Sequence, residues 1–342
     1  MFPATGTGAW EAALTNTLSP GDKVLAVRFG QFSHLWIDQA QRLGLDVVVQ
    51  DEEWGRGVDE ARVGAALAAD TSHSIKACLI VQNETTTGVT SDIAAVRAAM
   101  DAAKHPALLL VDGVSSIGAC DFKMDDWKVD VAVTGSQKAL SLPTGLALCC
   151  ASPKALAASK TAKLPRVFFS FDDMTKFNAT GGFPYTPSIP LLYGLKEALQ
   201  AMREEGLDTA IGRHARFADA TRAAVDAWGL SLLCAHPRWA SNSLTVVKAP
   251  AGMDTNALVR LAFSKYNLSI GVGLSRLSGQ VFRIGHIGDM DAVSLLGALA
   301  GVEMCLRDCG YTGFTPGAGV GAALTHLQKS TPLIPTRSLD AM

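Results

Sequence analysis

A lysine follows an apolar run in residues 129–138, and its chemistry depends on where that run places it. Residues 129–133 have the apolar character of a buried strand and the polar residues 134–137 form a turn, so Lys138 is expected at the strand's carboxyl end. Partial burial lowers the pKa of an amine, and the neutral amine can attack an aldehyde to form a Schiff base. A surface lysine after a strand is the alternative that this segment leaves open.

Asp112 ends a second apolar run, residues 107–111, and is therefore expected at the same edge of the sheet as Lys138. A carboxylate at that place can pair with a protonated pyridine nitrogen. That pairing keeps the ring able to store electrons when a substrate loses its alpha proton. The alternative is an aspartate that caps a helix or stabilises a turn.

Three further features could bind the same kind of ligand. The segment 5–8, Thr-Gly-Thr-Gly, precedes a helix and offers a phosphate hydroxyls, backbone N–H groups and the positive end of a helix dipole. Thr85, in the polar loop after the apolar run 77–81, could hydrogen-bond a ring hydroxyl, and Phe32 could stack on a planar ring. The alternatives are an ordinary helix cap, a polar loop and a core aromatic residue.

Arg283 stands inside the apolar run 281–284, where an unpaired guanidinium would be costly. A substrate carboxylate is a bidentate partner that would remove this cost, and a structural salt bridge to Asp or Glu is the alternative. The histidines His34, His214 and His286 show no metal-ligand spacing, so the sequence predicts no metal site.

The elements that must position these residues alternate between helix and strand along the first half of the chain. Helices are expected over residues 8–18 and 33–43, and a third is expected to begin with Ser91 as its cap. Continuous apolar strands between helices are typical of a parallel α/β sheet covered on both faces, with ligands beyond the strands' carboxyl ends. The expected strands are residues 24–29, 45–49, 77–81, 107–111 and 129–133.

The pattern changes after residue 150. Residues 164–190 are rich in Phe, Pro, Gly and Asp without a clear period, which predicts a functional loop region. Two helices are expected over 189–205 and 208–228, followed by short strands at 230–233, 243–247 and 281–284 mixed with helices. The sequence therefore predicts a large domain over residues 1–207 and a smaller α+β domain over 208–342.

Composition agrees with a two-domain globular enzyme. The 342 residues are 48% hydrophobic and 18% charged, and the formal net charge of -2 gives no basic field for nucleic acid. The seven cysteines include no Cys-x-x-Cys pair, which indicates a reducing compartment. No membrane span or signal peptide is visible, so we expect a soluble cytoplasmic protein.

Taken together, these motifs closely resemble those of serine-glyoxylate aminotransferases, which belong to the class V, fold-type I family of pyridoxal phosphate enzymes. The resemblance covers essentially the whole chain and implies a fold-type I transferase with a mainly parallel sheet and a smaller C-terminal domain. The matching segments are residues 5–11, 83–85, 111–116, 134–138, 184–187, 282–286 and 332–335.

The resemblance implies how the cofactor, pyridoxal 5'-phosphate, is bound. Residues Thr5, Gly6 and Thr7, with Gln137, would hold the phosphate. Thr85 and Asp112 would hold the ring, and the ring-stacking place would be taken by Phe32. The full set of expected cofactor contacts is Thr5, Gly6, Thr7, Phe32, Thr85, Asp112, Val114, Gln137, Lys138, Tyr185 and Thr186.

The resemblance also implies the reaction. Lys138 would carry the cofactor as an aldimine and move the substrate's alpha proton, while Arg283 would bind the substrate carboxylate. Tyr185 and Thr186 lie where the family reaches across a homodimer interface to the neighbour's cofactor. We expect a ping-pong transaminase in which serine or alanine gives its amino group to glyoxylate, and serine yields glycine and hydroxypyruvate.

Two alternatives to this function remain at this stage. The first is a relative with another donor, an aspartate- or alanine-glyoxylate aminotransferase. The second follows from the start of the chain, because family members carry a further amino-terminal arm and this chain begins almost directly at the phosphate segment. Under this second alternative, the protein would be an inactive chain that binds pyridoxal phosphate or dimerises.

Overall fold

The computed structural model describes residues 1–329, which fold into two compact units. The large unit contains Met1–Ile117, Phe122–Leu195 and Cys234–Trp239, and the small unit contains Gly118–Asp121, Lys196–Leu233 and the described chain from residue 240 on. The division falls within helix α7 (Ile189–Glu205), whereas the boundary expected from the sequence lies between residues 207 and 208. That domain boundary stays a prediction. The matching segment at residues 332–335 lies outside the described residues.

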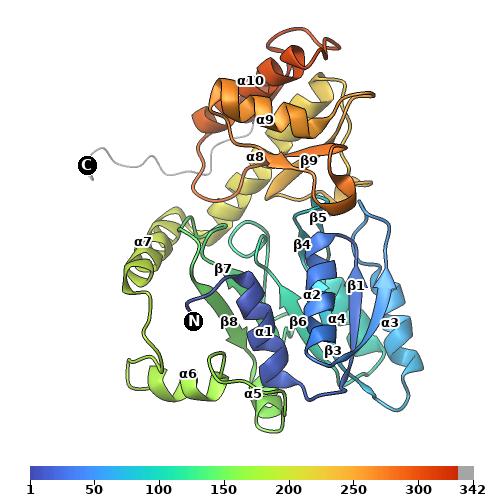
Figure 1. Ribbon diagram of the computed structural model, residues 1–342, viewed down its shortest axis with the longest axis vertical. Coiled ribbons are helices and arrows are strands. Elements are labelled where there is room, and N and C mark those ends of the chain that lie inside the picture. The colour runs from blue at the N-terminus through green and yellow to red at the C-terminus, as the bar shows by residue number, and fades with distance from the viewer. Residues whose placement is uncertain (330–342) are drawn as a thin grey trace. The chain divides into compact units, whose positions relative to one another are not determined.

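The large unit is built on a six-stranded sheet in the order β2-β1-β3-β6-β7-β8 (Figure 1). Neighbouring strands are parallel except β7 and β8, which pair antiparallel. The mainly parallel α/β sheet expected from the sequence is therefore confirmed. The strands are β1 (Lys23–Arg28), β2 (Asp46–Asp51), β3 (Ile75–Val81), β6 (Leu108–Asp112), β7 (Val131–Gly135) and β8 (Ala147–Ala151).

The central strands are buried almost throughout, as expected for strands with helices on both faces of the sheet. A short hairpin of β4 (Asn83–Glu84) and β5 (Val89–Thr90) follows β3. The helices of this unit are α1 (Gly6–Thr17), α2 (Gln31–Arg42), α3 (Glu60–Ala69), α4 (Ile93–Ala102), α5 (Pro153–Ser159), α6 (Phe171–Asn178) and the first part of α7, with a 3-10 turn at Pro237–Trp239.

Two local expectations were wrong. Asp92, not Ser91, caps α4, because its carboxylate accepts the N–H of Ala95 at 2.9 Å. The Ser91 hydroxyl instead accepts the N–H of Val58 from the loop before α3. The region 164–190 is also not a plain loop, because α6 begins inside it, where the hydroxyl of Ser170 caps the N–H of Asp173.

Arg166 stabilises the carboxyl ends of two helices in this region. Its guanidinium donates to the carbonyl of Thr15 in α1 at 3.1 Å and to that of Ser159 in α5 at 2.8 Å. It also contacts the carbonyls of Ala162 and Leu164. The last carbonyls of a helix lack intrahelical partners and lie at its negative end, so one cation satisfies both helices.

The small unit packs helices on a three-stranded antiparallel sheet in the order β10-β11-β9. The strand expected at 230–233 is reduced to a single bridge between Leu232 and Val247. The remaining elements agree with an α+β unit. They are α8 (Leu207–Ala227), β9 (Leu244–Lys248), α9 (Thr255–Tyr266), β10 (Gly271–Val272), a 3-10 turn at Ser275–Leu277, β11 (Val281–Gly285), α10 (Ala292–Asp308) and α11 (Ala318–Lys329).

The small unit satisfies its buried polar side chains internally. The Glu303 carboxylate accepts from the Trp228 indole at 3.0 Å and from the backbone N–H groups of Gly317 and Gly319, each at 2.7 Å, at the start of α11. His286 lies between the carbonyl of Asn242 and the hydroxyl of Thr245. Burial lowers the pKa of His286 to about 3, so its ring is neutral in the folded unit.

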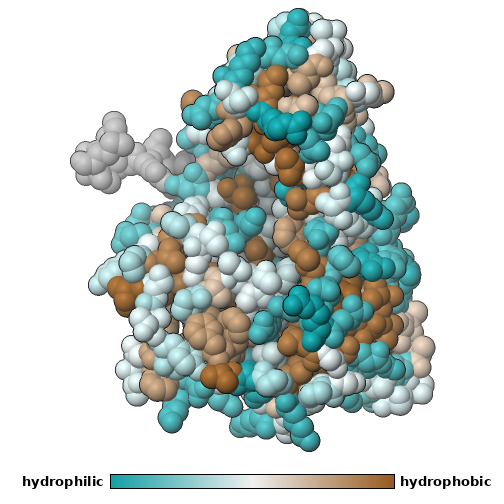
Figure 2. All heavy atoms as spheres, in the orientation of Figure 1, coloured by the Kyte–Doolittle hydropathy of each residue, from teal (hydrophilic) through white to brown (hydrophobic). Residues whose placement is uncertain are grey.

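The surface carries no helix suited to crossing a membrane within residues 1–329. Figure 2 shows hydrophobic residues in separate patches among hydrophilic ones on one face of the molecule. The large unit exposes apolar side chains before and within α7, among them Val167 (75% exposed), Ile189 and Tyr193.

Candidate active site

The carboxyl ends of β6 and β7 bring together the two residues expected to do chemistry. Asp112 is the last residue of β6 and pairs with Val133 of β7, and β7 ends at Gly135, three residues before Lys138. The Lys138 amine interacts electrostatically with the Asp112 carboxyl group. Lys138 is half-buried, which agrees with the expected site and not with a fully exposed surface lysine.

Asp112 is buried, with 4% of its surface exposed, and its carboxylate accepts the N–H of Val114 at 2.7 Å. Burial raises the pKa of this carboxyl group to about 7, because the ionised form loses its hydration. The negative charge of Glu84 raises the pKa further, while the Val114 N–H and the Lys138 charge oppose the rise. A cation brought to this carboxyl group would favour its ionised form.

Two glycines let neighbouring residues come close to the backbone at the start of α1. A Cβ on Gly6 would lie 2.6 Å from Val114 Cγ2, and a Cβ on Gly135 would lie 2.8 Å from Gln137 Oε1 and 3.6 Å from the Gly6 nitrogen. The first backbone N–H groups of α1 have no intrahelical partner and point toward this place. The side-chain oxygen of Gln137 is buried and has no hydrogen-bond partner among the described residues.

These residues fit pyridoxal phosphate. The glycine-lined helix start with Thr5 and Thr7 suits a phosphate, and Asp112 suits a protonated ring nitrogen. The Lys138 amine suits an aldehyde. One edge of one sheet therefore carries a group suited to each of the three functional parts of the cofactor.

Thr85 is held at this edge by the loop that follows β6. Its hydroxyl donates to Ser115 Oγ at 2.9 Å, and Ser115 in turn donates to the carbonyl of Asn83. The Asn83 amide also donates to Ser115 Oγ at 2.8 Å. Sequence reasoning gave no role to Ser115, although it lies in the motif after Asp112, because only the fold shows that the two loops meet.

The other expected cofactor contacts lie on the large unit in separate places. Phe32 is half-buried in the first turn of α2. Tyr185 stacks on Phe168, with ring centroids 5.0 Å apart, and its hydroxyl donates to the carbonyl of Val167 at 2.8 Å. Thr186 is exposed beside it. Cofactor contacts by Tyr185 and Thr186 stay predictions.

Arg283 belongs to the small unit, in the middle of β11 opposite Gly271 of β10. Its Nε donates to the carbonyl of Val272 at 2.8 Å. A Cβ on Gly271 would lie 3.1 Å from Arg283 Nε, so the glycine gives the guanidinium stem room to lie across the strand. The side chain is half-buried, and substrate binding by Arg283 stays a prediction.

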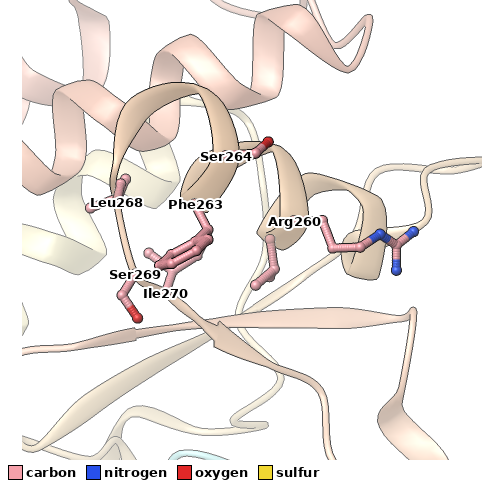
Figure 3. Close-up of a pocket in the computed structure, with 7 residues that line it drawn as sticks. Arg260, Phe263, Ser264, Leu268, Ser269 and Ile270 are labelled. Atoms are coloured by element: carbon pink, nitrogen blue, oxygen red, sulfur yellow. The ribbon is translucent and has the colours of Figure 1, made fainter.

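The small unit also has a hollow of about 610 Å³ between α9 and the following strand (Figure 3). Its walls are mainly apolar, and the Arg260 guanidinium points away from it in the view. The hollow therefore lacks the groups for amine or acid-base chemistry found in the large unit. Its lining residues are Val259, Arg260, Phe263, Ser264, Leu268, Ser269 and Ile270.

Comparison with known proteins agrees with this geometry. The model of the family "Aminotransferase class-V" matches residues 1–275. The chain is 57% identical to the serine-glyoxylate aminotransferase of Methylorubrum extorquens, over 96% of this chain and 83% of that protein. It is 51% identical to the L-aspartate-glyoxylate aminotransferase of Paracoccus denitrificans, over 97% of this chain and 83% of that protein.

A solved structure gives the same result for the fold. The pyridoxamine-pyruvate aminotransferase of Mesorhizobium loti superposes with a TM-score of 0.89 at 30% identity, covering 96% of this chain and 84% of that chain. The fold-type I architecture, the aminotransferase activity and the pyridoxal phosphate cofactor expected from the sequence are thereby confirmed. The chain belongs to the class V aminotransferases.

Proposed function

We propose that this enzyme transfers the amino group of serine to glyoxylate, giving glycine and hydroxypyruvate. The observation that supports it most directly is the meeting of Lys138, Asp112 and the glycine-lined start of α1 at one sheet edge, in a chain 57% identical to a serine-glyoxylate aminotransferase. Alanine as donor remains within the same proposal, because it would use the same amine and carboxylate contacts.

The residues of the large unit would have different roles in binding the cofactor and in the reaction. Bound pyridoxal phosphate supplies an aldehyde that links to an amine and a ring that stores the electrons released when a substrate's Cα–H bond breaks. Lys138 would hold the cofactor through its amine and then move the proton at the substrate's Cα. Asp112 would accept a hydrogen bond from the ring nitrogen and keep that nitrogen protonated. The N–H groups of Gly6 and Thr7, the Thr5 hydroxyl and the Gln137 amide would bind the phosphate.

Arg283 would bind the carboxylate that serine and glyoxylate share. The two substrates take part in alternate halves of a ping-pong reaction, so one guanidinium would serve both. This role is supported by the half-buried place of Arg283 in the middle of β11 and by the planar guanidinium, which can hold a carboxylate at two points.

A second donor is favoured by the L-aspartate-glyoxylate relative at 51% identity. The two functions are separated by measuring kcat/KM for serine, alanine and aspartate with glyoxylate as acceptor. We expect serine to be the best donor. A higher kcat/KM for aspartate would overturn the serine assignment while leaving transamination intact.

The chemistry itself is tested by Lys138→Ala. We expect multiple turnover to be lost, together with the covalent bond to the cofactor that borohydride makes permanent in the native enzyme. Phosphate and ring contacts would remain, so the variant should still bind the cofactor reversibly. Normal turnover by Lys138→Ala would show that Lys138 is an ordinary half-buried lysine and that the site is misassigned.

We further propose that the enzyme works as a cytoplasmic homodimer with Tyr185 and Thr186 near the partner's cofactor. Exposed apolar side chains such as Val167 and Ile189 support a protein partner on this part of the large unit. The proposed domain limits remain residues 1–207 and 208–342. Sedimentation at varied protein concentration measures the oligomeric state, and a monomer with full activity would contradict a shared site.

A further inference from the structure

The first turn of α2 is capped by side chains that come from another element. The N–H of Gln31 donates to Thr86 Oγ1 at 3.2 Å, and the N–H of Ser33 donates to Glu84 Oε2 at 2.9 Å. The N–H of Phe32 lies 3.4 Å from Glu84 Oε1. The first N–H groups of a helix have no intrahelical partner, so Glu84 of β4 and Thr86 of the loop after it satisfy the start of α2.

Glu84 is the centre of this cap. It has no exposed surface, and its carboxylate also accepts the Ser33 hydroxyl at 3.0 Å and the N–H of Thr86 at 3.1 Å. A Cβ on Gly30 would lie 2.2 Å from Glu84 Cδ, so only glycine lets the backbone before α2 come this close. A buried carboxylate is compensated here by several donors and by the positive end of the helix dipole.

The cap links two residues of the proposed ring site. Phe32, the expected stacking residue, is in the first turn that Glu84 caps. Thr85, the expected partner of the ring hydroxyl, lies between the two capping residues Glu84 and Thr86. The contacts of Glu84 therefore set the position of one side of the ring site relative to the other.

Glu84 also contributes charge to the site. Its carboxylate is one cause, after burial, of the raised pKa of Asp112. A fixed negative charge beside a buried pocket favours a cationic ligand group over a neutral one. The same residue thus positions the two ring contacts and favours a protonated ring nitrogen at Asp112.

We propose that Glu84 is a positioning residue of the cofactor site, which fixes Phe32 and Thr85 on the ring through the cap of α2. The inference rests on the proposed function, because Phe32 and Thr85 contact a ring only if pyridoxal phosphate binds at this edge. Glu84 contacts neither substrate nor reacting atoms in this proposal and acts through its neighbours.

The test compares Glu84→Gln with Asp59→Asn. Asp59 caps α3 through the N–H groups of Ala61 and Arg62, so both variants remove a carboxylate charge from a helix cap and keep a side-chain oxygen. The full chain is titrated with pyridoxal phosphate to obtain Kd, and the visible circular dichroism of the bound cofactor reports how its ring is held. We expect Glu84→Gln to raise Kd about 10- to 100-fold and to reduce the dichroism, and Asp59→Asn to change neither.

Ser33→Ala provides a second variant, which keeps the charge of Glu84. It removes the contact of the Ser33 hydroxyl with Glu84 and, at the same cap, its contacts with the N–H groups of Phe29 and Gly30. It should weaken cofactor binding in the same direction by a smaller factor, and combining it with Glu84→Gln should add little, because both variants act through the cap of α2. If Glu84→Gln does not fold, Ser33→Ala alone decides. Native Kd and native dichroism in Glu84→Gln, or in Ser33→Ala when only that variant folds, would overturn the proposal.

The Lys138→Ala variant separates this inference from the proposed function. Loss of the covalent bond to the cofactor in Lys138→Ala, with unchanged cofactor binding in Glu84→Gln, would overturn the positioning role alone. A cofactor bond that persists in Lys138→Ala would overturn the active site and, with it, the role of Glu84.

Discussion

The two units differ in how completely their buried polar side chains are hydrogen-bonded. In the small unit, within the described residues, Glu303, His286 and His214 are each bonded to neighbours of their own unit. The large unit keeps buried oxygens of Gln137 and Ser116 without a hydrogen-bond partner in the described chain. An unsatisfied buried polar atom costs stability, so its persistence points to a ligand that completes it.

The two units also differ in the ionisation of a buried titratable group, Asp112 in the large unit and His286 in the small unit. Burial shifts both groups toward their uncharged forms. His286 stays uncharged between two partners, whereas Asp112 lies near an amine, and a cation that joins it would favour its ionised form. Apart from Arg283, substitutions of buried polar groups in the small unit are therefore expected to act on stability, and those at the sheet edge on cofactor binding and turnover.

The largest effect is expected for Asp112→Asn. An amide cannot balance a protonated ring nitrogen, so kcat/KM should fall about 100- to 1000-fold. The matched control is Asp130→Asn, because Asp130 is equally buried at the other end of the sheet, where it accepts the N–H of Leu109. Asp130→Asn should lower the melting temperature and keep the turnover of the folded enzyme. Equal losses of activity in both variants would contradict the proposal that only the end of the sheet with Asp112 serves catalysis.

The same carboxyl group gives the cofactor-free protein a pH signature. Its pKa is about 7 when folded and 3.8 in a model compound, so the folded state holds the proton more tightly. Stability from this group is fully present below the unfolded pKa and is lost as pH rises toward 7, by on the order of a few kcal/mol. Denaturant titrations of the cofactor-free protein between pH 4 and 8 should show this fall, and Asp112→Asn should remove it.

Arg283→Lys tests the one small-unit residue to which we assign a substrate. Loss of the two-point fork should weaken the apparent binding of serine and of glyoxylate together, by about 1.5–3 kcal/mol each. Steady-state kinetics with each substrate varied in turn measure both effects. An unchanged KM for both substrates would show that Arg283 has a structural role, like the other polar side chains of the small unit described above.

Glu303→Gln should destabilise the small unit by about 1.5–3 kcal/mol and spare the active site, because the carboxylate accepts four hydrogen bonds and an amide would present N–H groups to at least one of these donors. Burial opposes ionisation of Glu303, but the Trp228 and backbone donors lower its pKa overall. Its stabilisation is therefore present above the unfolded pKa and lost as pH falls through the folded one. Urea unfolding of Glu303→Gln and of the exposed control Glu197→Gln measures this loss of stability. Equal stability of the two variants would contradict the prediction.

The smallest effect is expected for Asp92→Ala, which removes the cap of α4. The loss should be about 1 kcal/mol, the usual value for a helix cap, with cofactor affinity unchanged. Thermal unfolding and a cofactor titration of the same sample measure both quantities. A changed cofactor affinity would show that caps distant from the sheet edge also shape the site, and would weaken the case for a special role of Glu84.

Sequence patterns were sufficient for what depends on local chain properties. Apolar runs located β1, β3 and β6, and the motif around Lys138 placed the amine beside Asp112. The antiparallel edge strand β8 was not predicted, because its five residues look like any short apolar stretch. Glu84 lies in the matching segment 83–85, but its role was not predicted, since its partners Phe32 and Ser33 are some fifty positions away in the chain. Contacts between distant loops follow from the fold and not from spacing.

Arg166 has a consequence for limited proteolysis. Trypsin must draw an arginine side chain into its own acidic pocket from an extended segment, and this guanidinium already binds carbonyls of α1 and α5. The bond before the exposed Val167 is therefore protected in the native enzyme, although its surroundings look accessible. Cleavage there would report local opening of the two helix ends in the large unit.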